Sequence, residues 1–198
     1  MPTKPSQPRL RARYDERRER VIATAAELFA RRGYQATSIA DLSEAAGLAV
    51  GGIYHYIDGK EQLLFAIFGQ LMDPLLERAD AIAAAGDAPE EKLRELVRAW
   101  VRHVADHRFH MLVFAQERHA VESDPRWQDV RRSRRAFEAR LGAIIGDLDG
   151  RSGDRRLLAL ALLGMVNHMP TWYRPGGRLT PEAIADGYSD LVLDAIRA

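Results

Sequence analysis

The sequence predicts an all-α protein of about nine helices, with a small N-terminal domain and a larger C-terminal one. Apolar residues recur at three- and four-residue steps along most of the 198 residues. No run alternates apolar and polar residues for long enough to predict a strand. With 46% hydrophobic residues the chain can fill a core, which argues against wholesale disorder.

Composition excludes several classes of function. The chain has no Cys, so disulfides, thiolate metal ligands and a catalytic thiol are ruled out. Its longest apolar run, residues 157–166, is only half of what a bilayer requires, and the N-terminus lacks the apolar core of a signal peptide. We therefore expect a cytoplasmic protein with no membrane partner and no cofactor.

Basic residues are concentrated at the N-terminus, where they outnumber acidic residues seven to three among the first twenty positions. A basic end on a near-neutral body is typical of a module that binds a polyanion, although a solvated arm has the same composition. We predict a flexible basic arm over residues 1–12, a small domain that binds a polyanion over 13–58, and a larger domain over 59–198.

Short helices and a tight turn occupy the end of the predicted small domain. A first helix runs from Tyr14 to the residue before Gly33, a second spans residues 38–46, and a third covers about 50–56. Ser38 with Asp41 forms a weak capping box, and Gly47 ends the second helix. Two short helices joined in this way are the helix-turn-helix geometry, which lays the second helix of the pair into the major groove.

A fourth helix follows, for which Asp58 is the expected cap and Glu61 its partner. Pro74 removes a backbone donor inside this helix, so we expect a kink there.

This segment resembles the DNA-binding domain of the TetR/AcrR family of repressors. The matches fall in register without a gap, and are Gly33, Tyr34, Thr37, Ser38, Ile39, Leu42, Ala46, Gly47, Gly51, Ile53, Tyr54, Tyr56, Lys60, Glu61 and Leu63. The resemblance implies phosphate contacts by Thr37 or Ser38, Tyr54, Tyr56 and Lys60, with His55 close to base edges.

The front of the recognition helix departs from the family pattern. Ala49, Val50, Gly51 and Gly52 leave it almost without hydrogen-bonding side chains. Direct readout needs such groups, so we expect specificity to rest on close backbone approach, thymine-methyl contacts by Val50, and DNA shape. Arginines of the arm would add minor-groove contacts, as homeodomain arms do; these are Arg9, Arg11 and Arg13.

A helix from Asp154 to about His168 is apolar on nearly every face. Such a helix lies either in the centre of a monomer or at an interface. DNA binding to two half-sites favours the interface, as does the resemblance, because the last two helices of TetR-family proteins form the dimer contact. The expected dimer residues are Leu157, Leu160, Ala161, Gly164, Tyr188, Leu191, Val192 and Ala195.

Large residues of the central helices suggest a cavity for a small-molecule inducer. The candidates are Trp100, His103, Phe114, Trp127, Phe137, Asn167, His168, Trp172, Tyr173 and Arg174. The segment from Trp172, Tyr173 and Arg174 to Ala185 is similar to the C-terminal end of TetR-type regulators of fatty-acid and steroid catabolism. That resemblance implies an acyl-CoA ligand, with Arg174 on a phosphate, at a helix end or at an interface. Pro170 departs from that group's continuous helix.

Two other classes of function remain open. His103, His107 and His110 are spaced to share a helix face, which suggests a helical-bundle metal protein or enzyme, but no pair of Glu-x-x-His motifs accompanies them. A DNA-coating protein would bind without half-site spacing. We favour a non-enzymatic, dimeric repressor that binds a palindromic operator and is released by an apolar or amphipathic ligand. Residues 13–58 would then be its helix-turn-helix DNA-binding domain and residues 59–198 its ligand-binding and dimerisation domain.

Overall fold

The computed structural model describes residues 7–150 and 153–198, and it is helical throughout. The elements of this part of the chain are α1 (Pro8–Arg32), α2 (Ile39–Ala45), α3 (Val50–Ile53), α4 (Lys60–Ala84), α5 (Pro89–Asp106), α6 (Arg108–Gln116), α7 (Arg118–Ser123), a 3₁₀ turn η1 (Pro125–Trp127), α8 (Gln128–Gly146), α9 (Arg155–Trp172) and α10 (Pro181–Arg197). No strand occurs in these ranges, so the predicted all-α class is confirmed. None of these helices is long and apolar enough to cross a membrane.

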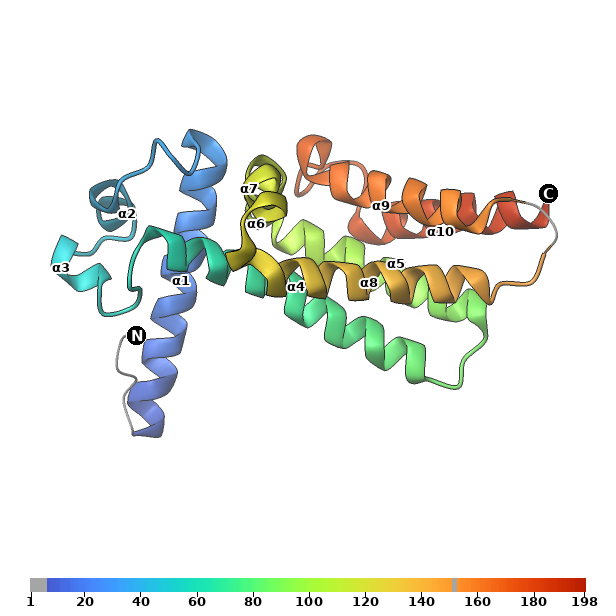
Figure 1. Cartoon of the computed structure of the whole chain (residues 1–198), viewed down its shortest axis with the longest axis horizontal. Helices are drawn as coiled ribbons and strands as arrows, with labels where there is room; N and C mark the ends of the chain where they lie inside the picture. The colour runs from blue at the N-terminus through green and yellow to red at the C-terminus, as the bar shows by residue number, and fades with distance from the viewer. Residues whose placement is uncertain (1–6, 151–152) are drawn as a thin grey trace.

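The molecule is elongated, with α1, α2 and α3 at one end and a bundle of long helices forming the rest (Figure 1). Helices α5, α8, α9 and α10 run roughly along the long axis, and α6 and α7 lie at the junction. Helix α4 belongs to both parts. It starts beside the short helices and continues into the bundle, where it packs against α5 and α8.

Local sequence signals explain where several helices begin. Ser38 caps α2 through a reciprocal capping box with Asp41, and the Thr180 hydroxyl accepts a hydrogen bond from the Ala183 N–H at the start of α10. Such caps satisfy backbone donors that the first turn leaves unpaired. The predicted start of α2 at Ser38 is confirmed.

Aromatic pairs join the helices of the bundle. Trp100 on α5 meets Phe137 on α8 edge to face, and Phe68 on α4 meets Phe114 on α6 in the same way. Trp127 stacks on Phe65 with ring centroids 4.0 Å apart. Such pairs stabilise by about 0.5–1.5 kcal/mol each beyond their burial, so aromatic contacts tie α4 to both α6 and η1.

The predicted flexible arm is wrong from Pro8 onward. Residues 8–12 form the first turn and a half of α1, while the first six residues lie outside the described part. Pro8 occupies the first turn, where proline is tolerated, and arginine, leucine and alanine are good helix formers. Helix propensity therefore extends α1 beyond its apolar pattern, and its N-terminal half projects from the domain (Figure 1).

Other boundaries also differ from the prediction. Helix α4 begins at Lys60 with Gly59 as its cap residue, not Asp58. Helix α3 has only four residues, and α7 was not predicted. Helix α9 continues through Pro170 to Trp172, and Arg108 donates a hydrogen bond from Nε to the Pro170 carbonyl. The proline thus remains inside the helix rather than ending it.

Candidate DNA-binding surface and ligand cavity

Helices α2 and α3 form the predicted helix-turn-helix. Gly47 adopts φ 63°, a left-handed conformation that favours glycine, and the Leu48 N–H then donates to the Ser43 carbonyl. Leu42 and Ile53 are buried in the core that the two helices share with α1. The turn and this small core fix the direction of α3.

The exposed side of α3 carries little hydrogen-bonding chemistry. Val50 is 51% exposed and Tyr54 50% exposed, while Ala49 and Gly51 are also at the surface. A Cβ at Gly51 or Gly52 would meet nothing within 4 Å. Packing inside the protein therefore does not require glycine at either position, and the bare surface is left open to an outside partner.

Tyr14 joins α1 to the end of α3. Its hydroxyl donates to the carbonyl of His55, and its ring lies 5.3 Å from the ring of Tyr56. His55 itself is exposed, and Tyr56 is half-buried. Tyr14 therefore supports His55 and Tyr56, two of the DNA contacts that the sequence predicts. The sequence analysis named Tyr14 only as the start of a helix and predicted no contact for it.

Lys60 is engaged with backbone rather than free at the surface. Its Nζ donates to the carbonyls of Tyr34 at 2.8 Å, Thr37 at 3.1 Å and Gln35 at 3.3 Å, and it lies over the Tyr34 ring. An ammonium has three donors, so all are used. Lys60 thus clamps the segment before α2 to the start of α4, and a phosphate would have to displace one of these carbonyls.

Of the two hydroxyl candidates before α2, the structure leaves only one accessible. Thr37 is 1% exposed and its hydroxyl donates to the Gly33 carbonyl, so its side chain does not face outward. Ser38 is exposed, and its hydroxyl donates to the Asp41 carboxylate at 2.5 Å. This hydrogen bond and a second one from the Ser38 N–H hold the pKa of Asp41 below its usual value.

Arg9, Arg11 and Arg13 are exposed on the projecting half of α1. They lie on a helix rather than on an extended arm, so their geometry differs from that of a homeodomain arm. A basic helical extension nevertheless retains the positive charge that favours a phosphate backbone.

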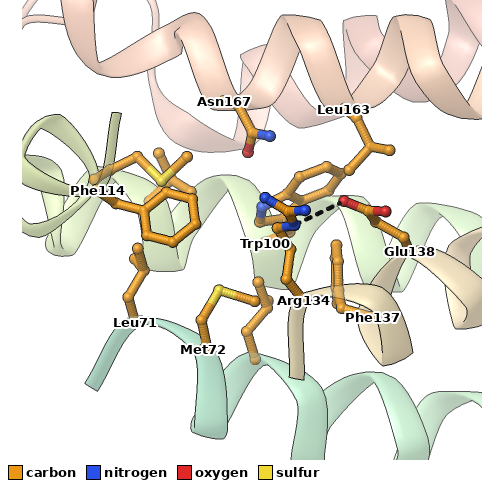
Figure 2. Close-up of a pocket in the computed structure, with 12 residues that line it drawn as sticks. Leu71, Met72, Trp100, Phe114, Arg134, Phe137, Glu138, Leu163 and Asn167 are labelled. Atoms are coloured by element: carbon orange, nitrogen blue, oxygen red, sulfur yellow. Dashed lines mark ion pairs between the residues drawn. The ribbon is translucent and has the colours of Figure 1, made fainter. Parts of the chain in front are cut away.

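An apolar cavity lies in the bundle between α4, α5, α6, α8 and α9. Its volume is about 30 Å³, and Figure 2 shows the residues around it. Of the predicted ligand residues, Trp100, Phe114, Phe137 and Asn167 line it. Sequence analysis did not select the others, which are Leu71, Met72, Leu75, Val104, Met111, Arg134, Glu138 and Leu163.

Arg134 brings charge to this apolar cavity. It forms an ion pair with Glu122 of α7, and its Nε lies 3.4 Å from a carboxylate oxygen of Glu138 (Figure 2). That Nε is buried and lacks a hydrogen-bond partner of good geometry. A signal existed in the sequence, since Arg134 and Glu138 are four residues apart on α8 and therefore share a helix face.

The remaining predicted ligand residues lie outside the cavity. Trp127 is stacked against Phe65 at the junction, and His103 lies in a groove on the other side of α4 and α5. His168 is exposed beside Thr171. A separate surface hollow is lined by Trp172, Tyr173, Arg174, Gly177, Arg178 and Leu179.

Arg174 ends α9 instead of facing the cavity, because its guanidinium donates to the carbonyls of Thr171 and Tyr173. Of the roles considered for Arg174, these hydrogen bonds fit the one at the helix end. A turn follows, with Gly176 at φ 73° and the Gly177 N–H donating to the Arg174 carbonyl.

The three histidines do form a row, but each ring is hydrogen-bonded. His103 is paired with the Leu71 carbonyl, His107 with the His103 carbonyl and His110 with the Gln70 side chain. Burial lowers the pKa of His103, and burial together with the other two imidazoles lowers the pKa of His110 to about 4. Within the described ranges, no group of three or more His, Asp or Glu side chains is placed to hold a metal ion.

An apolar face runs along α9 and α10. Leu157, Leu160 and Leu191 are exposed, and Ala161 and Gly164 lie on the same side of α9. Tyr188 and Ala195 are half-buried. Val192, in contrast, is buried within the protomer, so it belongs to the core rather than to this face.

Comparison with known proteins identifies the class. Residues 21–67 match the family model described as bacterial regulatory proteins, tetR family, and residues 86–196 match the Tetracyclin repressor-like C-terminal domain. The two matches span both parts of the fold. The chain belongs to the TetR family, whose members are transcriptional regulators rather than enzymes.

Individual relatives cover nearly the whole chain. The HTH-type transcriptional repressor KstR2 of Mycolicibacterium smegmatis is 29% identical over 98% of this chain and 95% of its own. The TetR-family regulator PfmR of Thermus thermophilus has a TM-score of 0.76 and 30% identity over 90% of this chain and 99% of its own. AibR, solved with isovaleryl coenzyme A and operator DNA, has a TM-score of 0.74 and 29% identity over 90% of this chain and 99% of its own.

Proposed function

We propose that the protein is a transcriptional repressor that binds a palindromic operator as a homodimer and is released by a small ligand, with an acyl-CoA thioester as the preferred class. The observation that carries the proposal is the position of α4. Its first residue, Lys60, clamps the helix-turn-helix, while Leu71, Met72 and Leu75 of the same helix line the apolar cavity. One continuous helix therefore contacts both sites.

The proposed DNA contacts are the accessible side chains around α3. Ser38, Tyr54 and His55 are accessible around α3, Tyr56 is half-buried beside them, and Val50 presents its methyl groups for thymine contact. Lys60 and Thr37 act indirectly, by holding the segment before α2. We assign sequence preference chiefly to backbone approach and DNA shape, because α3 offers few base-directed donors or acceptors.

A homodimer supplies the second recognition helix. Half-sites one helical turn apart are separated by about 34–36 Å, so a single helix-turn-helix needs a partner for useful affinity. The exposed leucines of α9 and α10 are suited to a two-fold interface, in which the same patch meets itself. We place the DNA-binding domain at residues 13–58 and the ligand-binding and dimerisation domain at 59–198, so that α4 starts at the boundary.

The cavity is too small for an acyl chain without rearrangement. About 30 Å³ holds roughly one water molecule, so a larger ligand must displace flexible side chains such as Met72, Met111 and Leu163. Displacement of Met72 and Met111 acts on α4 and α6, two helices that pack against α1. A ligand shifts the equilibrium between two arrangements only by its different affinity for each.

The KstR2 relative is named a repressor, and AibR was solved with an acyl-CoA and operator DNA. These names support the proposed direction of regulation and the ligand class. In the proposed mechanism, ligand binding lowers operator affinity.

The test starts with selection of bound DNA from a random pool, followed by gel shifts with and without CoA thioesters of several chain lengths. We expect one palindromic site, bound by a dimer and released by at least one thioester. Tyr54→Phe, which retains the ring and removes the hydroxyl, should weaken binding without altering the fold. Enrichment of no palindrome would indicate a DNA-coating protein, and absence of any ligand effect would contradict release by acyl-CoA.

A further inference from the structure

A second hollow adjoins the cavity on the side of α8 and α9. We call it the outer groove; its volume is about 570 Å³ and it is lined by Arg135, Glu138, Ala139, Gly142, Arg155, Arg156, Ala159, Leu160 and Leu163. Glu138 and Leu163 also line the apolar cavity. In Figure 2 these two side chains stand together at one side of it, beyond Arg134. The two spaces therefore meet at Glu138 and Leu163.

The outer groove is positively charged. Among its described lining residues the one carboxylate, Glu138, lies beside Arg134, whereas three arginines line the groove. Arg155 donates to the carbonyls of Leu148 and Gly150. Arg135 and Arg156 form no ion pair with any described residue. Two unneutralised guanidinium groups thus line a groove that shares Glu138 and Leu163 with the apolar cavity.

A groove on the opposite side provides an internal comparison. It shares Leu75 with the cavity and also contains three arginines, Arg78, Arg98 and Arg102. Each of those is paired, with Glu95, Asp186 and Glu182 respectively. The positive charge there is already neutralised, so an anionic ligand gains less from that side than from the outer groove.

We propose that the outer groove is the phosphate-binding half of a two-part ligand site, and that the ligand enters the cavity past Leu163 and Glu138. An acyl-CoA thioester has the required chemistry, since an apolar acyl group is joined through a narrow linker to a nucleotide bearing several phosphates. The acyl group occupies the cavity beside Trp100 and Phe137, and Arg135 and Arg156 bind the phosphates. This inference rests on the proposed ligand class and assigns residues to it.

The experiment measures ligand binding by isothermal titration calorimetry. It uses the full-length protein, which can form the proposed dimer, because Leu160 lies both in the outer groove and on the proposed dimer face. Butyryl, octanoyl and dodecanoyl thioesters are each compared on coenzyme A and on pantetheine, which lacks the nucleotide and its phosphates. Dodecyl phosphate tests whether a simple alkyl phosphate is sufficient. The variants are Arg135→Gln/Arg156→Gln and, as a matched control in the opposite groove, Arg98→Gln/Arg102→Gln.

We expect the wild-type protein to prefer the CoA thioester over its pantetheine counterpart by at least about tenfold, since charge-assisted hydrogen bonds contribute on this order. Added salt should reduce this preference. The Arg135→Gln/Arg156→Gln variant should lose the preference while still binding the acyl-pantetheine, and the control variant should retain it. Retained acyl-pantetheine binding shows that the cavity remains folded.

Equal binding of CoA and pantetheine thioesters, or an undiminished preference in the Arg135→Gln/Arg156→Gln variant, would overturn the assignment. So would failure of every thioester to bind, or dodecyl phosphate that binds as tightly as dodecanoyl-CoA. These outcomes are independent of operator binding. A protein released from DNA by CoA and pantetheine thioesters alike would contradict the groove assignment and leave the proposed repressor function standing.

Discussion

The Tyr14 hydroxyl lies 3.0 Å from the backbone carbonyl of His55 and donates a hydrogen bond to it. Through this contact, the projecting half of α1 holds the end of a recognition helix that has only four residues. So short a helix has little stability of its own. Its orientation therefore depends on neighbours such as Tyr14 rather than on its own backbone.

Tyr14→Phe should weaken operator binding by a few fold to about tenfold, because one hydrogen bond contributes about 0.5–1.5 kcal/mol. Tyr14→Ala should cost more, since the ring contact with Tyr56 is also lost. Fluorescence anisotropy with the selected operator measures both. Thermal melts serve as the control, and the Phe variant should unfold close to the wild-type temperature. Full operator affinity in Tyr14→Ala would show that α3 is oriented without this contact.

Lys60→Met distinguishes a clamp from a phosphate contact. Loss of three hydrogen bonds to carbonyls should lower the free energy of unfolding by about 1–3 kcal/mol and weaken DNA binding. Because Lys60 is expected not to bind phosphate directly, the dependence of affinity on salt should be unchanged. The measurements are urea unfolding and operator titrations at several salt concentrations. Arg13→Gln, an exposed substitution on α1, should leave the stability unchanged.

The opposite result would be a Lys60→Met variant of unaltered stability whose operator affinity depends less on salt, by about one phosphate contact. That result would contradict the clamp and restore the phosphate contact expected from the sequence.

The pair between Arg126 of η1 and Glu61 of α4 joins the C-terminal part to the start of the helix that carries Lys60. Arg126→Gln and Glu61→Gln should each change the free energy of unfolding by no more than about 0.5 kcal/mol, because the pair is exposed. Each should, however, reduce the effect of ligand on operator affinity by roughly threefold. Gel shifts with and without octanoyl-CoA measure this ratio. In the double variant the two losses should not add, whereas additive losses would show that the residues act separately.

Leu160→Asp and Leu191→Asp test the proposed dimer face. Both leucines are more than half exposed in the protomer, at 54% and 59%, so the fold should tolerate a charge at either position. Burial of one leucine contributes about 1.5–3 kcal/mol, and a buried aspartate costs more, so each substitution should weaken the dimer by at least about tenfold. Sedimentation velocity measures the change. Leu179→Asp, at an exposed leucine outside this face, is the control, and dimers unaffected by both substitutions would place the interface elsewhere.

Stability should fall as the pH is lowered from 7 toward 5. His110 has its pKa lowered from 6.5 to about 4 by burial and by its two neighbouring imidazoles, so the unfolded chain binds a proton in this range that the folded protein does not. Stability is therefore lost as the pH falls through the unfolded-state value. His103, whose pKa is also lowered by burial, contributes in the same direction.

Urea unfolding at pH 7 and at pH 5.5 measures this dependence. His110→Gln retains a donor near Gln70 but does not titrate, so its stability should depend less on pH than that of the wild type. An unchanged pH dependence in His110→Gln would show that this histidine is not its source.

Sequence analysis succeeded where the determinants are local. The Ser38–Asp41 box and the Gly47 turn each depend on residues within a few positions of one another, and both are present. The start of α1 was missed because its first turns carry helix-forming residues without an apolar pattern. Apolar residues recur at helical spacing only where one face of a helix is buried, and the projecting half of α1 is largely exposed.

The candidate sites were predicted less completely because their partners are distant in sequence. Lys60 has the residue type that a phosphate contact needs, but its three acceptors lie more than twenty residues earlier. Trp127 and Trp100 are both buried aromatics on helical faces, and only tertiary packing places one against Phe65 and the other in the cavity wall. Composition and spacing cannot distinguish these two surroundings.

The positions of the tryptophans have a practical consequence. Trp100 lies in the cavity wall, Trp127 is stacked at the junction between the two parts of the molecule, and Trp172 is exposed at the end of α9. Indole emission responds to local polarity and to ring contacts. Single-tryptophan variants of this chain would report occupation of the cavity and movement at the junction as two separate optical signals, so the order of these two events in time could be followed without any attached dye.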